Sequence, residues 1–326
     1  MPGLLTAAVA TALAFALAAP AALAQTANYP NRPIRILVGY PPGGATDIVA
    51  RVVGNALSVR LGQSIVVENK AGSASNIAAA EVAKAEPDGY TLLHGPDNLF
   101  LTNPHIYGGN MPLDPLKDLV AVSSLAANQL ILAVHPSVKV NNLREFAEVA
   151  RASKPPLFYA SIGNGSMHHI GMEILKEHLK LDLTHVPYRG GGPAGAALLA
   201  GNVQVMFGGG SLTSLVTSGK VRALGTTGAR RSPVLPDLPT IGEIYPGYEL
   251  LIWHGSFAPA KTPQPILSRL HREITSVLQQ PDVGERLVKS GSGEPYITTQ
   301  EEFAARIRSD SAKFGKVISM LGIKSE

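Results

Sequence analysis

The sequence contains no cysteine and a single tryptophan, and only 16% of its 326 residues are charged. Without cysteine the chain has no disulfide, no thiolate-ligated zinc or iron–sulfur centre and no thiol nucleophile. Hydrophobic residues make up 45% of the chain, which excludes wholesale disorder. Glycine and proline are abundant, with 33 and 25 residues, so we expect many tight turns and loops between buried elements.

Charge of one sign is nowhere concentrated. The formal net charge is +4, and the densest basic run is the pair Arg230 and Arg231. Recognition of nucleic acid through its phosphates needs a basic patch or stripe. We therefore expect no nucleic-acid partner and interpret the small excess of lysine and arginine as part of a solvated surface.

The first 24 residues carry no charged side chain and form the one long apolar stretch of the sequence. Residues 4–19 are almost continuously apolar, Pro20 interrupts them, and Ala22-Leu23-Ala24 has the small-x-small pattern of a cleavage site. We interpret residues 1–24 as a secretory signal peptide, which places the mature, soluble chain in the periplasm. The alternative is an uncleaved membrane anchor, because the stretch approaches the ~20 residues of a membrane span.

After this segment, short β-branched runs alternate with helical patterns. The first part of the chain predicts strands at 34–38, 65–67 and 90–93, and helices at 46–61 and 74–83. This βαβαβ order indicates a parallel sheet covered by helices. We expect Thr46 or Asp47 to cap the first helix and Gly62 to end it.

The same pattern restarts in the middle of the chain and predicts a second sheet. Its strands are expected at 130–134, 157–160, 183–186 and 203–207, and its helices at 142–152, 166–179 and 193–200. A proline-rich segment, 231–265, carries the tryptophan, and amphipathic helices at 265–278 and 303–321 follow. The predicted fold class is α/β with two sheets.

Three strand–helix junctions are rich in glycine, at residues 40–47, 160–169 and 188–195. Backbone N–H groups and the helix dipole bind a carboxylate or a phosphate at such a junction. The first junction lacks the lysine of a phosphate-binding loop. The third matches G-x-G-x-x-G, but no acidic residue follows to hold a ribose. Each junction is also compatible with a plain loop before a capped helix.

No Asp or Glu occurs in residues 183–236, which favours an anion near this segment. Arg189 would hold a carboxylate with its planar guanidinium, although an ordinary exposed arginine is an equal alternative. Ligands of parallel sheets bind at the carboxyl ends of the strands. Two such sheets facing each other would surround a small anion.

Evidence for catalysis or a metal is weak. The serine-hydrolase pattern G-x-S-x-G is absent, and a hydrolase would have to use Ser161 or Ser166 with His169. His169 and Glu173 lie one helical turn apart, which is more typical of a surface pair than of a metal site. We expect no enzyme activity, no metal and no cofactor.

Several short motifs resemble the Bug receptor family, the periplasmic solute-binding proteins of tripartite tricarboxylate transporters. They are PGGATD at 42–47, VEN at 67–69 followed by Gly72, PDGYTLL at 87–93, NPHIY at 103–107, HVPYRG at 185–190, PDLPT at 236–240, and FAP at 257–259 followed by TP at 262–263. The resemblance implies a two-lobed Venus-flytrap fold, with mixed or parallel sheets, two crossing strands and a ligand cleft. One lobe would comprise residues 28–128 and 252–326, and the other residues 129–251.

The resemblance also implies a site and partners. Its ligand-binding residues would be Tyr40, Gly43, Gly44, Thr46, Asp47, Asp97 or Asn98, Ser161, Gly163, Asn164, Ser166, His169, Arg189 and Gly208. Trp253 and His254 would wall the cleft, or Trp253 would lie in the core. The ligand would be a small organic carboxylate, and the partners transporter membrane subunits or, alternatively, a sensor kinase domain. The receptor is expected to be a monomer.

The chain departs from the family pattern in two places. Where the family often has Gly-Gln-x-Asp, this chain has Gly201-Asn202-Val203-Gln204, which removes the hydrogen bonds of that aspartate. After Gly72 the sequence reads Ser73-Ala74-Ser75-Asn76 in place of a glycine cluster. Neither departure changes the expected fold.

Overall fold

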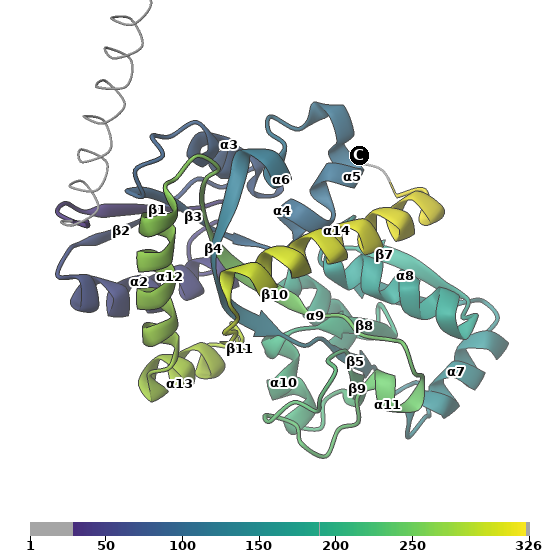
Figure 1. The fold of residues 1–326 in the computed structure, drawn as a ribbon. Helices are drawn as coiled ribbons and strands as arrows, with labels where there is room; N and C mark the ends of the chain where they lie inside the picture. The colour runs from purple at the N-terminus through teal and green to yellow at the C-terminus, as the bar shows by residue number, and fades with distance from the viewer. Residues whose placement is uncertain (1–28, 189, 324–326) are drawn as a thin grey trace, which may run out of the picture.

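The computed structural model describes residues 29–188 and 190–323, with the backbone alone at 210 and 211. Within these residues the chain forms two mixed sheets, each flanked by helices (Figure 1). The expected signal peptide at 1–24 lies outside the described residues. In the described part, no helix is both long enough and apolar enough to cross a membrane.

The first sheet has six strands in the order β11-β4-β10-β3-β1-β2. They span Ile34–Val38 (β1), Ile65–Asn69 (β2), Thr91–Pro96 (β3), Leu119–Asn128 (β4), Ile252–Pro259 (β10) and Glu294–Pro295 (β11). As the βαβαβ pattern predicts, β1 runs parallel to β2 and β3. Strands β10, β4 and β11 then join in antiparallel pairs.

The second sheet has five strands in the order β7-β6-β8-β5-β9. They span Ile131–Val134 (β5), Leu157–Ser161 (β6), Leu183–Pro187 (β7), Val205–Gly208 (β8) and Arg222–Thr226 (β9). Strand β6 is parallel to β7 and β8, whereas β5 is antiparallel to β8 and β9. The carboxyl ends of β6, β7, β8 and β9 therefore lie on one edge of the sheet.

The helices that position the site are α2 (Ala45–Leu61), α4 (Asn98–Leu101), α5 (Asn103–Tyr107), α8 (Met167–Leu179), α9 (Gly191–Leu199) and α10 (Gly210–Thr217). The others are α3 (Asn76–Ala83), α6 (Pro115–Asp118), α7 (Leu143–Ala152), α11 (Ile241–Ile244), α12 (Gln264–Leu278), α13 (Pro281–Lys289) and α14 (Gln300–Leu321), with short 3₁₀ turns at Ser73–Ser75 and Gly108–Asn110. Gly62 ends α2 in the left-handed conformation, as expected.

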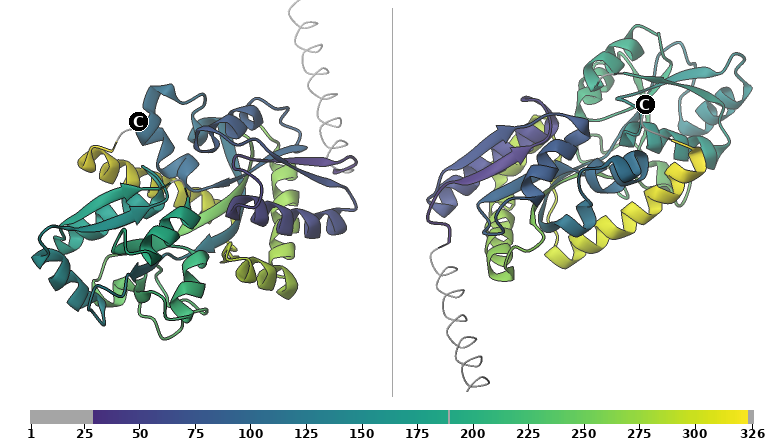
Figure 2. Two further views of the ribbon diagram at one scale, coloured as in Figure 1. Left: turned by 180° about the vertical axis from the view of Figure 1, so that it is seen from behind. Right: turned by 90° about the horizontal axis from the view of Figure 1, so that it is seen from above.

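Two connections and one helix join the sheets. The chain passes from β4 to β5 after Asn128 and returns from β9 to β10, which starts at Ile252. Helix α14 begins with a capping box between Thr299 and Glu302. It packs against β4 and α4 on one side and against α8 on the other, and Figure 2 shows it running along both units. One buried hydrophobic cluster, with members from Leu37 to Ile318, extends across both sheets.

The two departures from the family pattern have local explanations. The Gln204 side chain forms two hydrogen bonds, accepting from the Phe158 N–H at 2.9 Å and donating to the Gly201 carbonyl at 3.0 Å. Residues 73–75 all have a positive φ, between 44° and 80°. The backbone conformation that glycines adopt readily is thus held here by serine and alanine.

Sequence patterns missed four strands, β4, β9, β10 and β11. The long strands β4 and β10 contain small and polar residues, such as Ser123, Ser124 and Gly255, so they do not read as β-branched runs. A Cβ at position 255 would come within 2.6 Å of the Phe303 ring. The strand therefore needs glycine where α14 packs most closely on the sheet.

The single tryptophan lies in the middle of an aromatic cluster formed by Phe100, Trp253, Phe257 and Phe303. Trp253 is fully buried, with its ring centroid 5.0 Å from that of Phe303 and 6.3 Å from that of Phe100. The cluster joins β10, α4 and α14, so it stabilises the region from which both crossings depart.

We expect Trp253→Ala to lower the free energy of unfolding by about 3–5 kcal/mol, because it leaves a large cavity in a packed core. Trp253→Phe keeps a ring in place and should cost clearly less. Urea unfolding of the two variants measures both values. A loss below about 1 kcal/mol for Trp253→Ala would show that the tryptophan is not part of the core.

Candidate functional site

A cavity of about 1390 Å³ lies where the edges of the two sheets face each other. Its walls come from the loops that follow β1, β3, β6, β7 and β8, and from the strand ends where the chain crosses between the sheets. The sequence predicts this arrangement, because ligands of parallel sheets bind at the carboxyl ends of strands.

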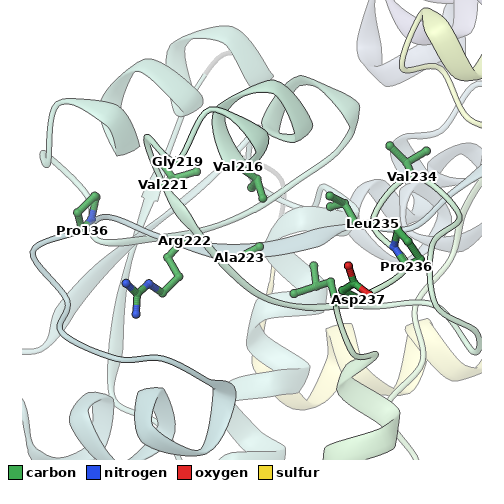
Figure 3. Close-up of a pocket in the computed structure, with 11 residues that line it drawn as sticks. Pro136, Val216, Gly219, Val221, Arg222, Ala223, Val234, Leu235, Pro236 and Asp237 are labelled. Atoms are coloured by element: carbon green, nitrogen blue, oxygen red, sulfur yellow. The ribbon is translucent and has the colours of Figure 1, made fainter.

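A second, smaller hollow of about 610 Å³ lies beside β9 (Figure 3). Figure 3 shows Pro136, Val216, Arg222 and the segment 234–237 around it. The Arg222 guanidinium is already bound to the Val140 carbonyl and the Asn141 side chain, both at 2.5 Å. No glycine-rich strand–helix junction contributes to this hollow, so the larger cavity is the candidate site.

At the first junction, Tyr40, Gly43, Gly44 and Thr46 line the cavity, as expected. Gly43 has a φ of +83°, and Gly44, not Thr46 or Asp47, is the N-cap of α2. The capping prediction is therefore wrong. The extended backbone of Gly44 starts the helix without any side-chain cap, and its carbonyl accepts from the Ile48 N–H.

Asp47 binds this loop on the side that faces away from the cavity. Its buried carboxylate accepts hydrogen bonds from the Gly43 N–H at 2.9 Å, from Arg51 Nε at 2.9 Å and from Asn69 Nδ2 at 2.9 Å. Asp47 does not line the cavity, and the Gly43 amide is already bound. Burial alone would raise the pKa of Asp47, but the hydrogen bonds from Arg51, Gly43 and Asn69 outweigh it and lower that pKa.

A network of side-chain amides fixes the neighbouring wall. Asn98 accepts from the Tyr40 hydroxyl at 3.2 Å and donates to the Ala74 carbonyl at 3.2 Å. Asn103 donates to the same carbonyl at 2.9 Å. The left-handed residues 73–75 thus present the Ala74 carbonyl to two amides beside the cavity, and Asn98 lines it as expected.

At the second junction, Gly163, Asn164 and Ser166 line the cavity. Ser166 is the N-cap of α8, because its hydroxyl accepts from the His169 N–H at 3.3 Å and donates to the Gly163 carbonyl at 2.7 Å. Gly165 has a φ of +71°, and a Cβ there would lie 2.2 Å from the Ile106 side chain. Glycine at 165 therefore lets α5 from the first sheet touch this loop.

Ser161 and His169, which were also expected at the site, are not among the residues that line the cavity. The His169 ring stacks on the His185 ring with centroids 3.9 Å apart, and its Nδ1 accepts from the Gly165 N–H at 3.1 Å. The Ser161 hydroxyl is buried and lies 2.7 Å from His185 Nε2. His168, one position earlier on α8, faces the cavity instead.

Neither serine hydroxyl is hydrogen-bonded to the His169 ring, so the geometry does not support the predicted alternative of a hydrolase pair between Ser161 or Ser166 and His169. Ser166 contacts the His169 backbone and not its ring, and Ser161 pairs with a different histidine. The Glu173 carboxylate accepts hydrogen bonds from the Tyr159 hydroxyl and from Lys176 Nζ, so it already has partners other than His169. Among the described residues, no cluster of three or more His, Asp or Glu side chains has the arrangement of a metal site.

At the third junction, Gly190, Gly191 and Gly192 line the cavity, and Gly190 with φ +108° precedes α9. Arg189 lies outside the described residues. After β8, Gly209 lines the cavity rather than the expected Gly208. A Cβ at 208 would collide with Leu212 at 2.4 Å, so Gly208 allows α10 to pack close to the strand.

Trp253 was expected either at the cleft wall or in the core, and the structure places it in the core. Successive side chains of β10 point to opposite faces of the sheet. Trp253 therefore points into the aromatic cluster, while its neighbours Ile252 and His254 line the cavity. His254 Nδ1 lies 3.5 Å from the Thr46 hydroxyl. Burial lowers the pKa of His254 to about 4, which keeps this imidazole neutral at pH 7.

The cavity has little positive charge in the part of the chain that the structure describes. Its one described cationic side chain, Lys289, forms an ion pair with Glu285. The polar surroundings consist mainly of loop backbone, hydroxyl and amide groups, with the N-termini of α2, α8 and α9 directed at the same space. Such an arrangement binds an anion through N–H and O–H dipoles.

The chain matches known proteins over nearly its whole length. Residues 49–323 match the sequence model of a family described as the tripartite tricarboxylate transporter family receptor. A protein of a Pseudomonas species, named for the tcbD-tcbE intergenic region, is 35% identical and covers 95% of this chain and 93% of its own. Protein BugT of Bordetella pertussis is 32% identical, with 95% of both chains covered.

Solved structures agree with this match. The periplasmic binding protein BugD has a TM-score of 0.75 and 32% identity, covering 91% of this chain and 100% of its own. Rpa4515 of Rhodopseudomonas palustris, solved with adipate, has a TM-score of 0.78 and 31% identity over 91% and 99% of the two chains. MatC of the same species, solved with malate, has a TM-score of 0.73 and 30% identity, covering 89% of this chain and 100% of its own. The predicted two-lobed binding-protein fold is confirmed.

We expect Asp47→Ala to lower the free energy of unfolding by about 2–3 kcal/mol, because it removes a charged acceptor from buried donors. The matched control is Arg51→Ala, which removes an exposed partner of the same carboxylate and should cost less than about 1 kcal/mol. Because the folded-state pKa of Asp47 is lowered, its contribution is fully present at neutral pH and declines as the pH falls below about 4 toward that lower pKa. Urea unfolding at pH 7 and pH 3 measures both effects, and equal losses in the two variants would contradict this role.

The stacked pair His169 and His185 predicts a dependence on pH. Burial, together with a smaller effect of the neighbouring His169, lowers the pKa of His185 to about 4. The unfolded chain takes up this proton near pH 6.5, so stability is present above that pH and is lost as pH falls toward 4. In His185→Gln, the decrease in melting temperature between pH 7 and pH 5 should be smaller than in the wild type. An identical decrease would show that His185 does not titrate in this way.

Proposed function

This chain belongs to the tripartite tricarboxylate transporter receptor family, and on that premise we propose that it is a periplasmic solute-binding protein for a small organic carboxylate. It would deliver the carboxylate to a tripartite tricarboxylate-type transporter without catalysis. Export would depend on the signal peptide at residues 1–24. Residues 28–128 with 252–326 would form one lobe and residues 129–251 the other, and the receptor would act as a monomer.

The observation that carries the proposal is the convergence of three helix N-termini on one cavity. Helices α2, α8 and α9 start from glycine-rich loops that line it. Partial positive charge at each N-terminus favours an anion. The paired state of Lys289 leaves this role to N–H and O–H groups in the described part of the cavity.

The size of the cavity and the ligands of relatives support a carboxylate. About 1390 Å³ is ample for a small organic acid. Two family structures at 30% identity or more were solved with dicarboxylates, adipate and malate. The walls also include apolar side chains, among them Ile106, Ile162 and Met167, which suit the carbon chain of such a ligand.

Release and capture would occur by movement about the two crossings between the sheets. The β4–β5 connection and the β9–β10 connection both line the cavity, at residues 127–131 and 251–252. A ligand that contacts both sides binds the closed arrangement better and shifts the population toward it. The contact between Ile106 and Gly165 shows that the two sides already touch at one point.

Thermal unfolding with four small molecules tests the proposal. Adipate and malate should raise the melting temperature, whereas adipamide and hexane-1,6-diamine should not, because they replace the anionic groups by neutral or cationic ones. A dicarboxylate at about 1,000 times its Kd should add about 4 kcal/mol of stability. Stabilisation by the diamine or the diamide, with no effect of any mono-, di- or tricarboxylate, would contradict the proposal.

The partner needs a separate measurement. The ligand-loaded receptor should bind detergent-solubilised membrane subunits of a tripartite tricarboxylate transporter and should stimulate uptake in vesicles. Binding to a sensor kinase domain, without binding to such membrane subunits, would replace the transporter by a signalling partner and leave the carboxylate site unchanged.

A further inference from the structure

Asp97 is a buried acidic residue at the wall of the cavity, and one of its carboxyl oxygens has no hydrogen-bond partner among the described residues. Asp97 follows β3 and precedes α4, and only 2% of the residue is exposed. The unpartnered atom is Oδ2. Because Asp97 also lines the cavity, the free carboxyl oxygen has a ligand or water as its natural partner.

The groups packed around Asp97 offer no countercharge to its carboxyl. The Tyr40 phenol and the Asp310 carboxylate on α14 lie close enough to interact with it, and Arg306 Nε holds Asp310 at 2.5 Å. His254 pairs with Pro96, the residue before Asp97, while His94 interacts with His254 and Tyr107 with Tyr40. No ion pair involves Asp97 among the residues that the structure describes, and both imidazoles are buried. Burial lowers the pKa of His94 to about 3 and that of His254 to about 4, so both are neutral at pH 7.

These surroundings favour the protonated form of the acid. Burial raises the pKa of Asp97 to about 8, because its effect exceeds that of the backbone hydrogen bonds of Asn98 and Trp253, which lower the pKa, and the negative charge of Asp310 adds to the rise. At pH 7 most of the molecules would then carry a carboxylic acid at position 97, which has one O–H donor.

We propose that Asp97 acts as a neutral acid that donates a hydrogen bond to a carboxylate of the bound ligand. This inference rests on the proposed function, because it needs an anionic ligand in the cavity. An ionised Asp97 would repel a ligand carboxylate at this wall, whereas an O–H···O⁻ bond is short and strong. The ligand group opposite Asp97 is therefore an anionic acceptor and not an ammonium, which selects dicarboxylates over amines.

The proposal requires that ligand binding and proton binding are linked. The protonated receptor binds the dicarboxylate, and the proton on Asp97 stays in the complex. Above pH 8 the free receptor loses this proton, so binding must take it up again from solution. The ligand itself adds no such dependence, because simple carboxylates are fully ionised above pH 6.

Isothermal titration calorimetry with adipate and malate, on the full mature chain between pH 6 and pH 9, tests this linkage. The Kd of the wild type should rise about tenfold between these pH values. Asp97→Asn places a neutral donor of the same shape at this position, so its Kd should be independent of pH and within a few-fold of the wild-type value at pH 6. Asp237→Asn is the matched control, since it removes an acid beside the second hollow, and it should keep the wild-type rise.

Proton uptake by the wild type gives a second readout that needs no variant to fold. Titrations at pH 9 in buffers of different ionisation enthalpy should show uptake of about one proton per adipate, and none at pH 6. A pH-independent wild-type Kd, or a rise that persists in Asp97→Asn, would overturn the role of Asp97. Binding of hexane-1,6-diamine that is as tight at pH 6 as at pH 9 would also overturn it, since that requires an acid that is already ionised at pH 6. If no dicarboxylate binds at any pH, the proposed function fails first, and this inference fails with it.

Discussion

The site depends on the fixed directions of the backbone N–H groups at the strand–helix junctions. Because the described cation of the cavity, Lys289, is already paired, the proposed anion would be bound mainly by dipoles in the described part of the site, and dipoles are effective only when they point to the ligand in advance. In the structure, side chains hold the first and second junctions from the side away from the cavity. Asp47 binds the Gly43 N–H, the Ser166 hydroxyl binds the Gly163 carbonyl, and the His169 ring binds the Gly165 N–H. Each of these side chains therefore positions a loop.

The same constraint explains the buried polar network that surrounds the cavity. Asn98, Asn103 and the Ala74 carbonyl are bound to one another, as are Ser161 and His185. Buried polar groups with partners cost little and make the structure rigid, whereas unpartnered ones are costly. Four described atoms are buried, unpartnered and belong to residues at the cavity wall: Asp97 Oδ2, Gln129 Oε1, His168 Nδ1 and Thr226 Oγ1. They are polar groups that a bound ligand is able to satisfy.

Much of this organisation could be predicted from sequence, because the alternation of strands and helices shows where each junction falls. The glycine-rich loops after β1, β6 and β7 were found in this way, and their residues line the cavity. The roles of Asp47, Ser161 and His169 were not predictable. Whether an α8 histidine faces the cavity depends on the stacking partner His185, which comes from another element. Likewise, Trp253 is buried because it lies on strand β10. The small and polar residues of β10 do not form a β-branched run, so the sequence pattern does not indicate a strand there.

The central claim is that the cavity holds an organic anion without a catalytic step. It is tested most directly by denaturing the purified receptor and identifying the released small molecule by mass spectrometry, without any choice of candidate ligands. The account predicts an organic acid with at least one carboxylate, released intact and in proportion to the chain. A neutral or cationic compound, or a product formed from a substrate on incubation with the protein, would contradict it.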